Sequence, residues 1–386
     1  METFNEKALY LYKFIGQCLP IYAFYPVLFV ERGMTVSNVV LLIALWSVFN
    51  IAFEIPAGIL ADRWNRRNML AIAAVLQGVC FVIWFFSHSL FMFALGFLFW
   101  GIAGAFTSGT EESLIYDNLK NDGRVDSFAK VYGKAQFFAA IGVLVGIGSA
   151  GAIAVFINIE IIALISAVIC FVNAFFAMRI MERNAYQKSK DSTVVTLKKA
   201  LSFIRESRLA LACILFLVLF GLGSYMDEFD ALVASDWDIS VLWVSGILVV
   251  RFAFAALGDI LAPMVGKKIK SARQIFLMNV VACILLASFA LIWSWHAILI
   301  FGMAFMLMAI AQILLVDALQ KEIKEEGRAT VMSFFGVGQN LTMICLSLIF
   351  AGLLRIITLQ QVYILVAVYG IVGGLVFCLL FKKIRS

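Results

Sequence analysis

Long runs of apolar residues alternate with short polar segments along the whole chain. The runs are about 18–25 residues long, which is the length that an α-helix needs to cross the hydrocarbon core of a bilayer. Because lipid offers no hydrogen-bond partners, a backbone that crosses it must satisfy its own polar groups, as a helix does. The pattern predicts twelve membrane-spanning helices, at residues 8–30, 38–61, 69–87, 90–117, 130–157, 159–180, 208–232, 240–264, 274–294, 296–319, 330–354 and 358–381.

Composition supports the same all-α integral membrane class. Of 386 residues, 63% are hydrophobic and 14% are charged, and the mean hydropathy is +1.01. A soluble domain has about 45–50% apolar and about 25% charged residues, so no water-soluble fold hides this much apolar surface. The seven cysteines lie in apolar runs without metal-ligand spacing, so we expect no metal site. The amino terminus lacks a basic region and a cleavage site, so we expect no removable signal peptide.

The distribution of positive charge predicts the orientation. The formal net charge is +6, and 27 of the 30 lysines and arginines fall in segments on one side of the predicted spans. The exceptions are Arg32, Arg251 and Arg355. Basic residues gather on the cytoplasmic side of membrane proteins. We therefore expect a multi-pass plasma-membrane protein with both termini in the cytoplasm, and no nucleic-acid partner.

A long polar stretch divides the predicted helices into two equal groups. It covers residues 182–207 and predicts a cytoplasmic linker between an N-terminal six-helix bundle, residues 1–181, and a C-terminal one, residues 208–386. The sequence Leu-Ile-Tyr-Asp-Asn-Leu at 114–119 is repeated as Leu-Leu-Val-Asp-Ala-Leu at 314–319, and a Gly-Arg pair follows each copy. Chance similarity between apolar helices is the alternative explanation of this repeat.

A recognisable loop follows the second predicted span. Residues 54–67 read Glu-Ile-Pro-Ala-Gly-Ile-Leu-Ala-Asp-Arg-Trp-Asn-Arg-Arg. This loop resembles the signature G-x-L-A-D-R-x-G-R-R of the major facilitator superfamily. The resemblance implies a transporter with two pseudo-symmetric six-helix bundles. Asn65 replaces a glycine, and because asparagine tolerates a left-handed turn, we expect the loop to keep its shape.

The loop and the repeat together predict a latch that closes the cytoplasmic side. The second half has Pro263 where the loop has its aspartate, so we expect an asymmetric latch. Simple anchoring of basic residues at the inner interface is the alternative. The expected latch residues are Gly58, Asp62, Arg63, Arg66, Arg67, Asp117, Arg124, Asp317 and Arg328.

The fifth predicted span contains regularly placed glycines that let helices approach closely. The pattern resembles the antiporter motif G-x8-G-x3-G-P-x2-G-G of the same superfamily, which implies a proton-coupled exporter. Ile147 stands where that motif has proline, and Ala150 replaces a glycine. Ordinary helix packing is the alternative. The matching glycines are Gly133, Gly142, Gly146 and Gly151.

The fourth predicted span carries two carboxylates in its inner third. Glu111 and Glu112 lie where a charge is costly unless it faces water or a partner. The segment resembles the stretch S-G-x-x-E-A-L-x-Y-D of drug-exporter-like members, which singles out Glu112 and Tyr116. These groups are candidates for proton coupling or cargo binding. The alternatives are a gate residue paired with Arg124 or Lys120, and a residue in interfacial water.

Further intramembrane charges extend the candidate site. Arg251 lies near the bilayer midplane and needs either a carboxylate or an anionic cargo. Asp227, Glu228 and Asp230 lie at the closest depth, and a purely structural ion pair is the alternative. Glu54, beside a proline in the second span, is a candidate for coupling or for a conformational gate.

We therefore predict a secondary active transporter that exports a small amphipathic molecule or drug in exchange for protons. The alternatives are an uptake symporter or facilitator of a small metabolite, and a channel or a membrane scaffold without transport activity. No catalytic, phosphate-loop or dinucleotide motif is present in the sequence, so we expect neither an enzyme nor a cofactor. The expected partners are a small-molecule cargo, protons and the lipid bilayer, and we expect a monomer.

Overall fold

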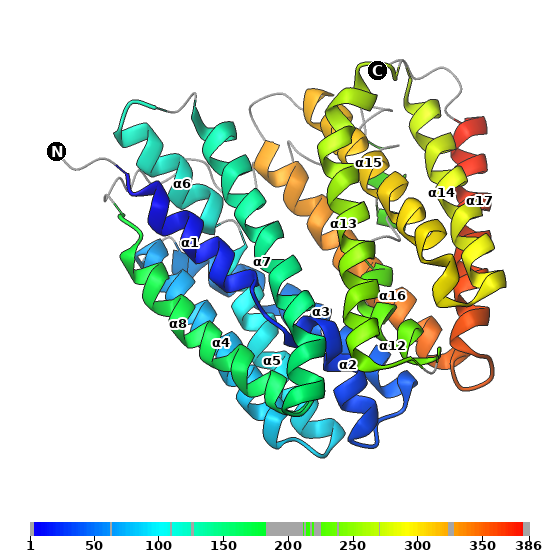
Figure 1. Cartoon of the computed structure of the whole chain (residues 1–386). Helices are drawn as coiled ribbons and strands as arrows, with labels where there is room; N and C mark the ends of the chain where they lie inside the picture. Colours follow the sequence, from blue (N-terminus) through cyan, green and yellow to red (C-terminus); the bar gives the residue numbers. More distant parts are fainter. Residues whose placement is uncertain are drawn as a thin grey trace. The chain divides into compact units, whose positions relative to one another are not determined.

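Helices form all the regular elements among the residues that the structure describes (Figure 1). The computed structural model describes residues 4–61, 64–108, 110–124, 127–182, 211, 214–216, 218, 219, 225–237, 239–269, 271–322 and 328–380. Within those ranges side chains are described except at residues 55, 58, 59, 61, 112, 129, 227, 235, 319–322, 328–336 and 380.

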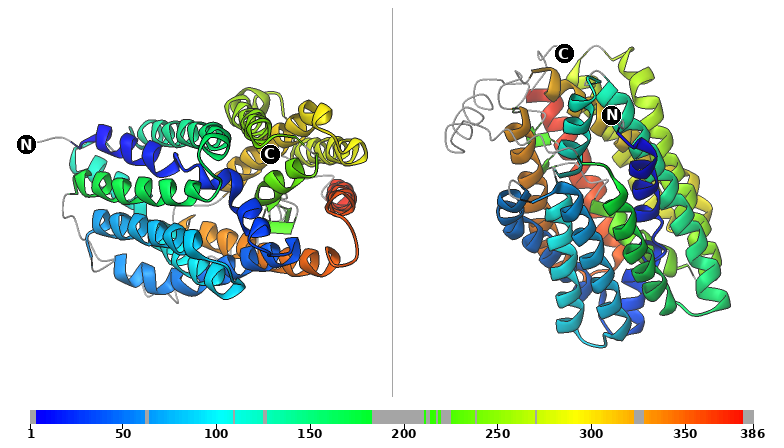
Figure 2. Two further views of the ribbon diagram at one scale, coloured as in Figure 1. Left: turned by 60° about the horizontal axis from the view of Figure 1, so that its bottom comes forward. Right: turned by 90° about the vertical axis from the view of Figure 1, so that its left-hand side faces the viewer.

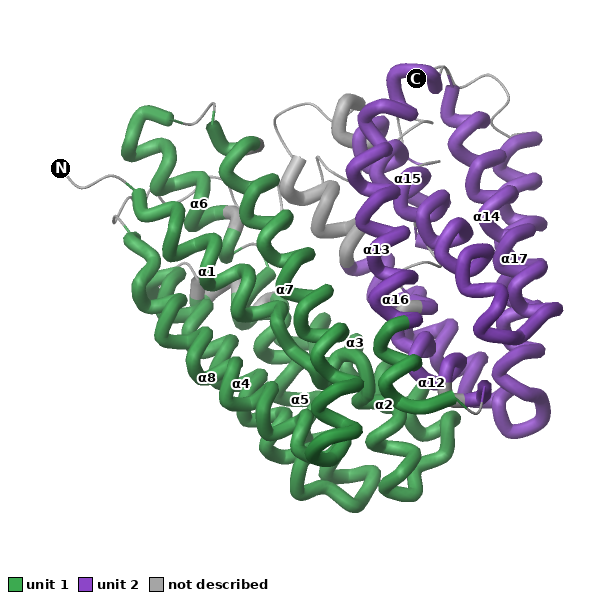
Figure 3. Tube along the Cα trace, viewed as in Figure 1, with its two compact units in different colours: residues 1–188, 239–246 green, residues 189–238, 247–386 purple. Residues whose placement is uncertain are grey.

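The chain divides into two compact units (Figure 3). Unit 1 comprises residues 1–188 and 239–246, and unit 2 comprises residues 189–238 and 247–386. The predicted 182–207 linker lies almost entirely outside the described residues, so its boundaries remain a prediction.

Unit 1 contains the first six predicted spans. Its helices are α1 (Glu6–Gln17), α2 (Ile21–Glu31), α3 (Val36–Ala61), α4 (Arg66–Phe86), α5 (Leu90–Thr107), α6 (Thr110–Asn121), α7 (Phe128–Phe156) and α8 (Ile161–Arg179).

Two spans predicted as continuous helices are each split in two, so the prediction was wrong in this detail. The 8–30 span forms α1 and α2, because Pro20 has no N–H to donate and disfavours helical backbone before it. The 90–117 span forms α5 and α6, because Ser108 leaves the helical conformation and its N–H closes the last turn onto the Gly104 carbonyl.

The helices of unit 1 pack in neighbouring pairs. Helix α8 packs against both α1 and α4, and α4 also packs against α5 (Figure 2). Helix α7 packs along α1, and α3 packs along α5. The buried cluster between α1, α4, α6, α7 and α8 includes Leu9, Leu70 and Ile115, each with almost no exposed surface. This packing fixes α1 and α6 next to each other in space.

Unit 2 contains the later spans, with the first residues of α13 assigned to unit 1. In unit 2, α14 packs between α15 and α17 around a core that includes Phe276, Leu315 and Phe377. The described elements are η2 (Asp227–Phe229), α12 (Asp230–Ser235), α13 (Val241–Gly266), α14 (Ala272–Ile292), η3 (Trp295–Ala297), α15 (Ile298–Glu322), α16 (Arg328–Leu353) and α17 (Leu359–Leu380).

Ten described helical segments are long and apolar enough to cross a membrane. Helix α16 adds a shorter apolar stretch, Val337–Leu353, and the predicted 208–232 span lies mostly outside the described residues. Large apolar side chains such as Phe91, Phe156 and Leu291 are exposed, as expected where a helix faces lipid. The protein is an integral membrane protein, and the predicted all-α fold class is confirmed.

Candidate functional site

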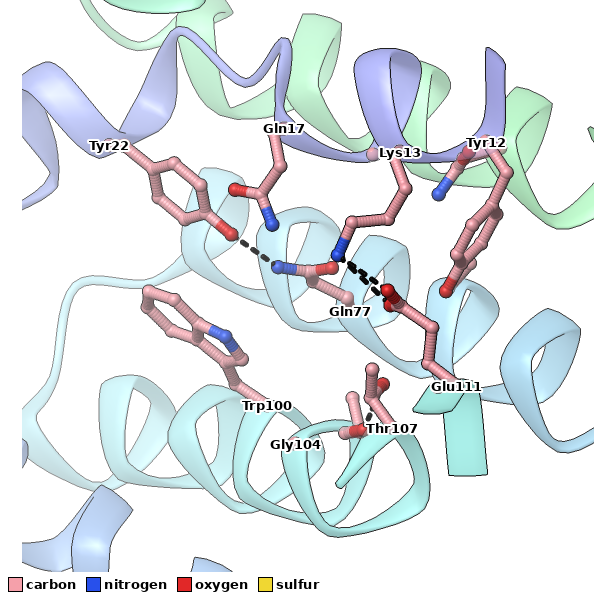
Figure 4. A pocket seen from close by; sticks show the side chains of 14 residues that line it. Tyr12, Lys13, Gln17, Tyr22, Gln77, Trp100, Gly104, Thr107 and Glu111 are labelled. Carbon is pink, nitrogen blue, oxygen red and sulfur yellow. Dashed lines mark hydrogen bonds and ion pairs between the residues drawn. The ribbon is translucent and has the colours of Figure 1, made fainter. Parts of the chain in front are cut away.

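A cavity of about 190 Å³ lies inside unit 1 (Figure 4). Its wall includes the end of α1, the end of α5 and the start of α6, so it lies at the interruptions of the two split spans. Irregular backbone at membrane depth is tolerated where it lines a cavity. The polar side chains in the wall include Lys13, Gln17, Gln77, Thr107, Glu111 and Asn173.

Lys13 and Glu111 form an ion pair in the wall of the cavity. The Lys13 Nζ lies 2.9 Å from Glu111 Oε1 and donates to Oε2 at 3.0 Å. The two side chains are only 11% and 8% exposed. Glu111 is in the first turn of α6, where the helix dipole stabilises a carboxylate. Removing either partner would leave a buried, uncompensated charge.

Amide groups and aromatic rings form the rest of the wall. The Tyr22 hydroxyl accepts a hydrogen bond of 2.8 Å from Gln77 Nε2, and the Tyr22 ring stacks on Trp100 at a centroid distance of 5.7 Å. Asn173 is buried, and its Oδ1 has no hydrogen-bond partner among the described residues. Figure 4 shows Gln77 beside the Lys13–Glu111 pair. The cavity therefore suits a small molecule that carries both a ring and hydrogen-bonding groups.

The structure distinguishes between the two predicted carboxylates of the fourth span. Glu111 lines the cavity and pairs with Lys13, and not with Arg124 or Lys120. Its partner lies 98 residues away in the sequence, and only the packing of α1 beside α6 brings the two together. Glu112 belongs to α6, but its side chain lies outside the described residues. For Glu112 the alternative pairing stays open.

Two further candidates lie outside the cavity wall. Glu54 is partly buried, and its Oε1 accepts a hydrogen bond of 3.3 Å from the Ser108 hydroxyl, at the break between α5 and α6. Tyr116 is 43% exposed and packs edge-on against Phe128. Coupling or cargo binding by either residue stays a prediction.

The signature loop contacts α6 through an ion pair. Arg66, the first residue of α4, pairs with Asp117 in the last turns of α6. The first backbone amides of α4 are bound by Glu182, whose Oε1 and Oε2 accept from Arg66 N at 2.7 Å and Arg67 N at 3.2 Å. Asn65 has φ −66° and ψ 128°, so it needs no left-handed turn. The predicted shape of the whole loop stays a prediction, because residues 62 and 63 lie outside the described residues. The loop enters α4 in extended conformation.

Arg124, predicted for the latch, pairs with Glu6. The Arg124 Nη2 lies 2.7 Å from Glu6 Oε1, and the Glu6 Oε2 accepts from the Tyr10 hydroxyl at 2.9 Å. The backbone N–H of Phe4 donates to Asp122 at 2.8 Å. The start of the chain is therefore attached to the end of α6.

The structure describes only some of the remaining predicted latch residues. Asp317 is exposed near the end of α15, a place in its helix similar to that of Asp117 in α6. Asp62 and Arg63 lie outside the described residues, and the side chain of Arg328 is not described. Gly58 lies within α3.

The glycines of α7 divide into two kinds. A Cβ at Gly142 would lie 2.3 Å from the Phe14 carbonyl oxygen, and one at Gly146 would lie 2.7 Å from a backbone nitrogen after α1. These two glycines let α7 touch the backbone beside Lys13. A Cβ at Gly151 would lie 2.7 Å from an Oγ in the 239–246 segment of unit 1, whereas one at Gly133 would meet nothing within 4 Å.

In unit 2, Arg251 forms a buried ion pair with Asp230. The Arg251 Nε lies 2.7 Å from Asp230 Oδ2, and the side chains are 1% and 2% exposed. The predicted need for a carboxylate is met by this one of the three acidic candidates. Glu228 is partly buried and interacts electrostatically with Asp230, and the side chain of Asp227 is not described.

Arg32 binds the backbone at the end of α4 in unit 1. This residue was not among the candidates selected from the sequence. Its guanidinium donates to the carbonyls of Ser87 at 2.8 Å and Phe85 at 3.3 Å, where α4 ends. It also lies 2.8 Å from a carboxylate oxygen of Glu160 and contacts the His88 ring. The signal available in the sequence was an arginine on the side that has few lysines and arginines.

Comparison with known proteins places the chain in a family. The sequence model of the Major Facilitator Superfamily matches residues 14–326. A Na(+), Li(+), K(+)/H(+) antiporter of Planococcus maritimus is 27% identical over 132 residues, which are 33% of this chain and 31% of that protein. An uncharacterized transporter of Buchnera aphidicola is 26% identical over 207 residues, 52% of this chain and 50% of that protein. The matches thus span a third to a half of these relatives.

Solved structures share the fold over nearly the full length. The nucleoside transporter NupG aligns with a TM-score of 0.80 at 17% identity, covering 98% of this chain and 99% of that one. A D-xylose-proton symporter aligns with a TM-score of 0.74 at 13% identity, covering 96% of both chains. At these identities the likeness concerns the fold.

Proposed function

Because the chain belongs to the Major Facilitator Superfamily, whose members are secondary transporters and in general not enzymes, we propose that it exchanges a small amphipathic molecule for protons. The direction is export across the plasma membrane. The proposal assigns the coupling proton to Glu111 and the binding of cargo to the cavity around it.

The Lys13–Glu111 pair in the cavity wall is the observation that carries this proposal. With Glu111 ionised, the pair is neutral and each charge is held by the other at 2.9 Å. Adding a proton to Glu111 removes that attraction and leaves the Lys13 ammonium exposed to the cavity. Cargo affinity then differs between the two protonation states, and by linkage the proton affinity changes when cargo binds. Such coupling is what an exchanger requires.

The cavity wall supports an amphipathic cargo. Tyr22 and Trp100 present stacked rings, while Gln77 and Asn173 supply amide groups beside the ion pair. Flat apolar rings favour a hydrophobic or aromatic part of the cargo, and the amides favour a polar part. The amide groups also favour the second candidate function, uptake of a small polar metabolite together with protons.

Two observations favour exchange over uptake. Gly142 lets α7 contact α1, the helix that carries Lys13. The spacing of the α7 glycines resembles that of proton-coupled exporters. A relative of part of the chain is named as a cation/H(+) antiporter. In the proposed cycle, two bundles, residues 1–181 and 208–386, alternate around the cargo, with both termini in the cytoplasm and a monomer as the working unit.

The Arg66–Asp117 pair is the proposed latch. It joins the signature loop to α6, the helix that begins with the Glu111 turn. A change at Glu111 can therefore reach the loop through one helix. Glu182 steadies the same end of α4 through its two backbone amides.

Transport in proteoliposomes with an imposed pH gradient tests the proposal. A panel of ring-bearing amines, alcohols and carboxylates is offered, and accumulation is followed by mass spectrometry. An exchanger concentrates its cargo only on the acidic side and loses this dependence in Glu111→Gln. Glu31→Gln is the matched control and keeps the dependence, because it removes an exposed carboxylate at the end of α2, outside the cavity wall.

Four other outcomes contradict the proposal. A symporter concentrates cargo on the side opposite to the acid. A facilitator reaches the same final distribution with or without the gradient. A channel moves cargo without saturation, and a scaffold moves none of the panel.

A further inference from the structure

The buried ion pair in unit 2 is surrounded by hydroxyl groups with unmet hydrogen-bonding capacity. Tyr225, Tyr363 and Ser347 are buried, the Tyr225 and Ser347 hydroxyls lie within reach of each other, and the Tyr363 hydroxyl has no hydrogen-bond partner among the described residues. Tyr363 interacts electrostatically with Asp230, Arg251 and Tyr225, and Ser347 lies beside the Tyr225 hydroxyl. The three hydroxyls and the carboxylate therefore form one polar cluster.

Buried water is the simplest way to satisfy this cluster. A buried hydroxyl left without a partner loses the hydrogen bonds that it makes to water in the unfolded chain. Asp230 Oδ1 is likewise buried without a hydrogen-bond partner among the described residues. Buried waters in proteins make about three hydrogen bonds each and are found where several polar groups converge. Four oxygen atoms around one ion pair provide such a place.

Two aromatic rings contact Arg251 and can stabilise its positive charge when Asp230 is neutral. The guanidinium carbon lies 4.2 Å from the ring centroid of Phe252 and 4.0 Å from that of Phe305. Cation–π contacts are stronger when they are desolvated, as these are. If Asp230 becomes neutral, Arg251 keeps its positive charge, and the rings continue to stabilise it. A permanently ionised pair would balance its own charge without them.

We propose that Asp230, Tyr225, Tyr363 and Ser347 form a buried water site in unit 2 at which Asp230 takes up and releases a proton. The proton passes from a water molecule to a carboxylate oxygen of Asp230, and the neutral acid then donates a hydrogen bond to water or to a neighbouring hydroxyl. The net charge of the pair changes from zero to +1, and Arg251 stays protonated.

Among the described side chains, the other titratable groups around Asp230 are Glu228, Arg251 and the two tyrosines. Glu228 is partly buried and interacts electrostatically with Asp230. Protonation at this site does not depend on the proposed function. Only its use as a second coupling proton rests on that proposal.

Infrared difference spectroscopy of the full chain in lipid bilayers tests the site without any cargo. A titration of the wild type is expected to show the carbonyl band of a protonated carboxylic acid that grows as the pH falls. Asp230→Asn removes this band, whereas Asp259→Asn, on the same helix as Arg251 but exposed, leaves it in place. In D2O the band shifts as soon as the solvent is exchanged, because water touches the acid.

A second variant keeps the test decisive if Asp230→Asn does not fold. Tyr363→Phe removes one hydroxyl and preserves the ring packing, so it is expected to shift the frequency of the same band. Absence of a band that depends on Asp230, a band that does not titrate, a band that ignores D2O, or a frequency unchanged in Tyr363→Phe would each overturn the proposal. Because the spectra are recorded without cargo, a failure of proton-coupled transport leaves this result unaffected.

Discussion

Gly142 in α7 offers a sharp test of the packing around the cavity. A methyl group added there would lie 2.3 Å from the Phe14 carbonyl oxygen and 3.2 Å from the Gln17 Cβ, whereas ordinary contacts begin near 3.4 Å. Helices α1 and α7 would have to separate by about 1 Å at this point, because the nearest obstacle is backbone and cannot rotate away. Gly142→Ala should therefore destabilise unit 1 and displace Lys13.

Gly133→Ala is the matched control on the same helix. Its new methyl would meet nothing within 4 Å, so only the better helix propensity of alanine remains, about 1 kcal/mol in favour of folding. That gain is common to both variants and cancels when they are compared. The difference between them is then the overpacking penalty, about 1–3 kcal/mol.

Reversible unfolding in mixed micelles measures both variants against the wild type. We expect the free energy of unfolding of Gly142→Ala to lie about 1–3 kcal/mol below that of Gly133→Ala. We also expect transport to be impaired in Gly142→Ala alone. Equal stabilities would refute the close contact between α1 and α7.

Three further predictions concern ion pairs and caps. Lys13→Met and Glu111→Gln should each lower the free energy of unfolding by about 3–5 kcal/mol. In a double-mutant cycle the double variant should lose less free energy of unfolding than the sum of the two single losses. Strict additivity would argue against the ion pair. Glu182→Ala should lose about 1 kcal/mol in the same unfolding assay, because the first amides of α4 lose their acceptor; an unchanged value would show that water replaces it. Arg32→Met should speed hydrogen–deuterium exchange at residues 85–89, and unchanged exchange would show that these carbonyls need no cap.

The helices of this protein are well predicted from hydropathy because each span needs an apolar run of fixed length. The interruptions of the helices are not predicted from hydropathy, because one residue such as Pro20 or Ser108 hardly changes the average over a span. Those interruptions shape the cavity, so the sequence predicts the bundle better than its binding site.

Charges inside the bundle are predictable in kind but not in partner. A carboxylate at Glu111 and a guanidinium at Arg251 stand out because a lone charge at that depth is costly. The predicted depth in the membrane left three acidic residues as possible partners of Arg251. In the structure the partner is Asp230. Lys13 was counted only among the basic residues on the cytoplasmic side. The sequence did not reveal its partner, because Glu111 lies 98 residues away and only the fold brings the two side chains together.

The most direct test of the account is proton release on binding of cargo to the purified chain, followed with a pH-sensitive dye in weakly buffered solution. The cargo is the compound that the transport panel identifies. The wild type should release protons when cargo is added, Glu111→Gln should release none, and Glu112→Gln should behave as the wild type does. Release that persists in Glu111→Gln, or that disappears only in Glu112→Gln, would contradict the assignment of the coupling proton to the Lys13–Glu111 pair.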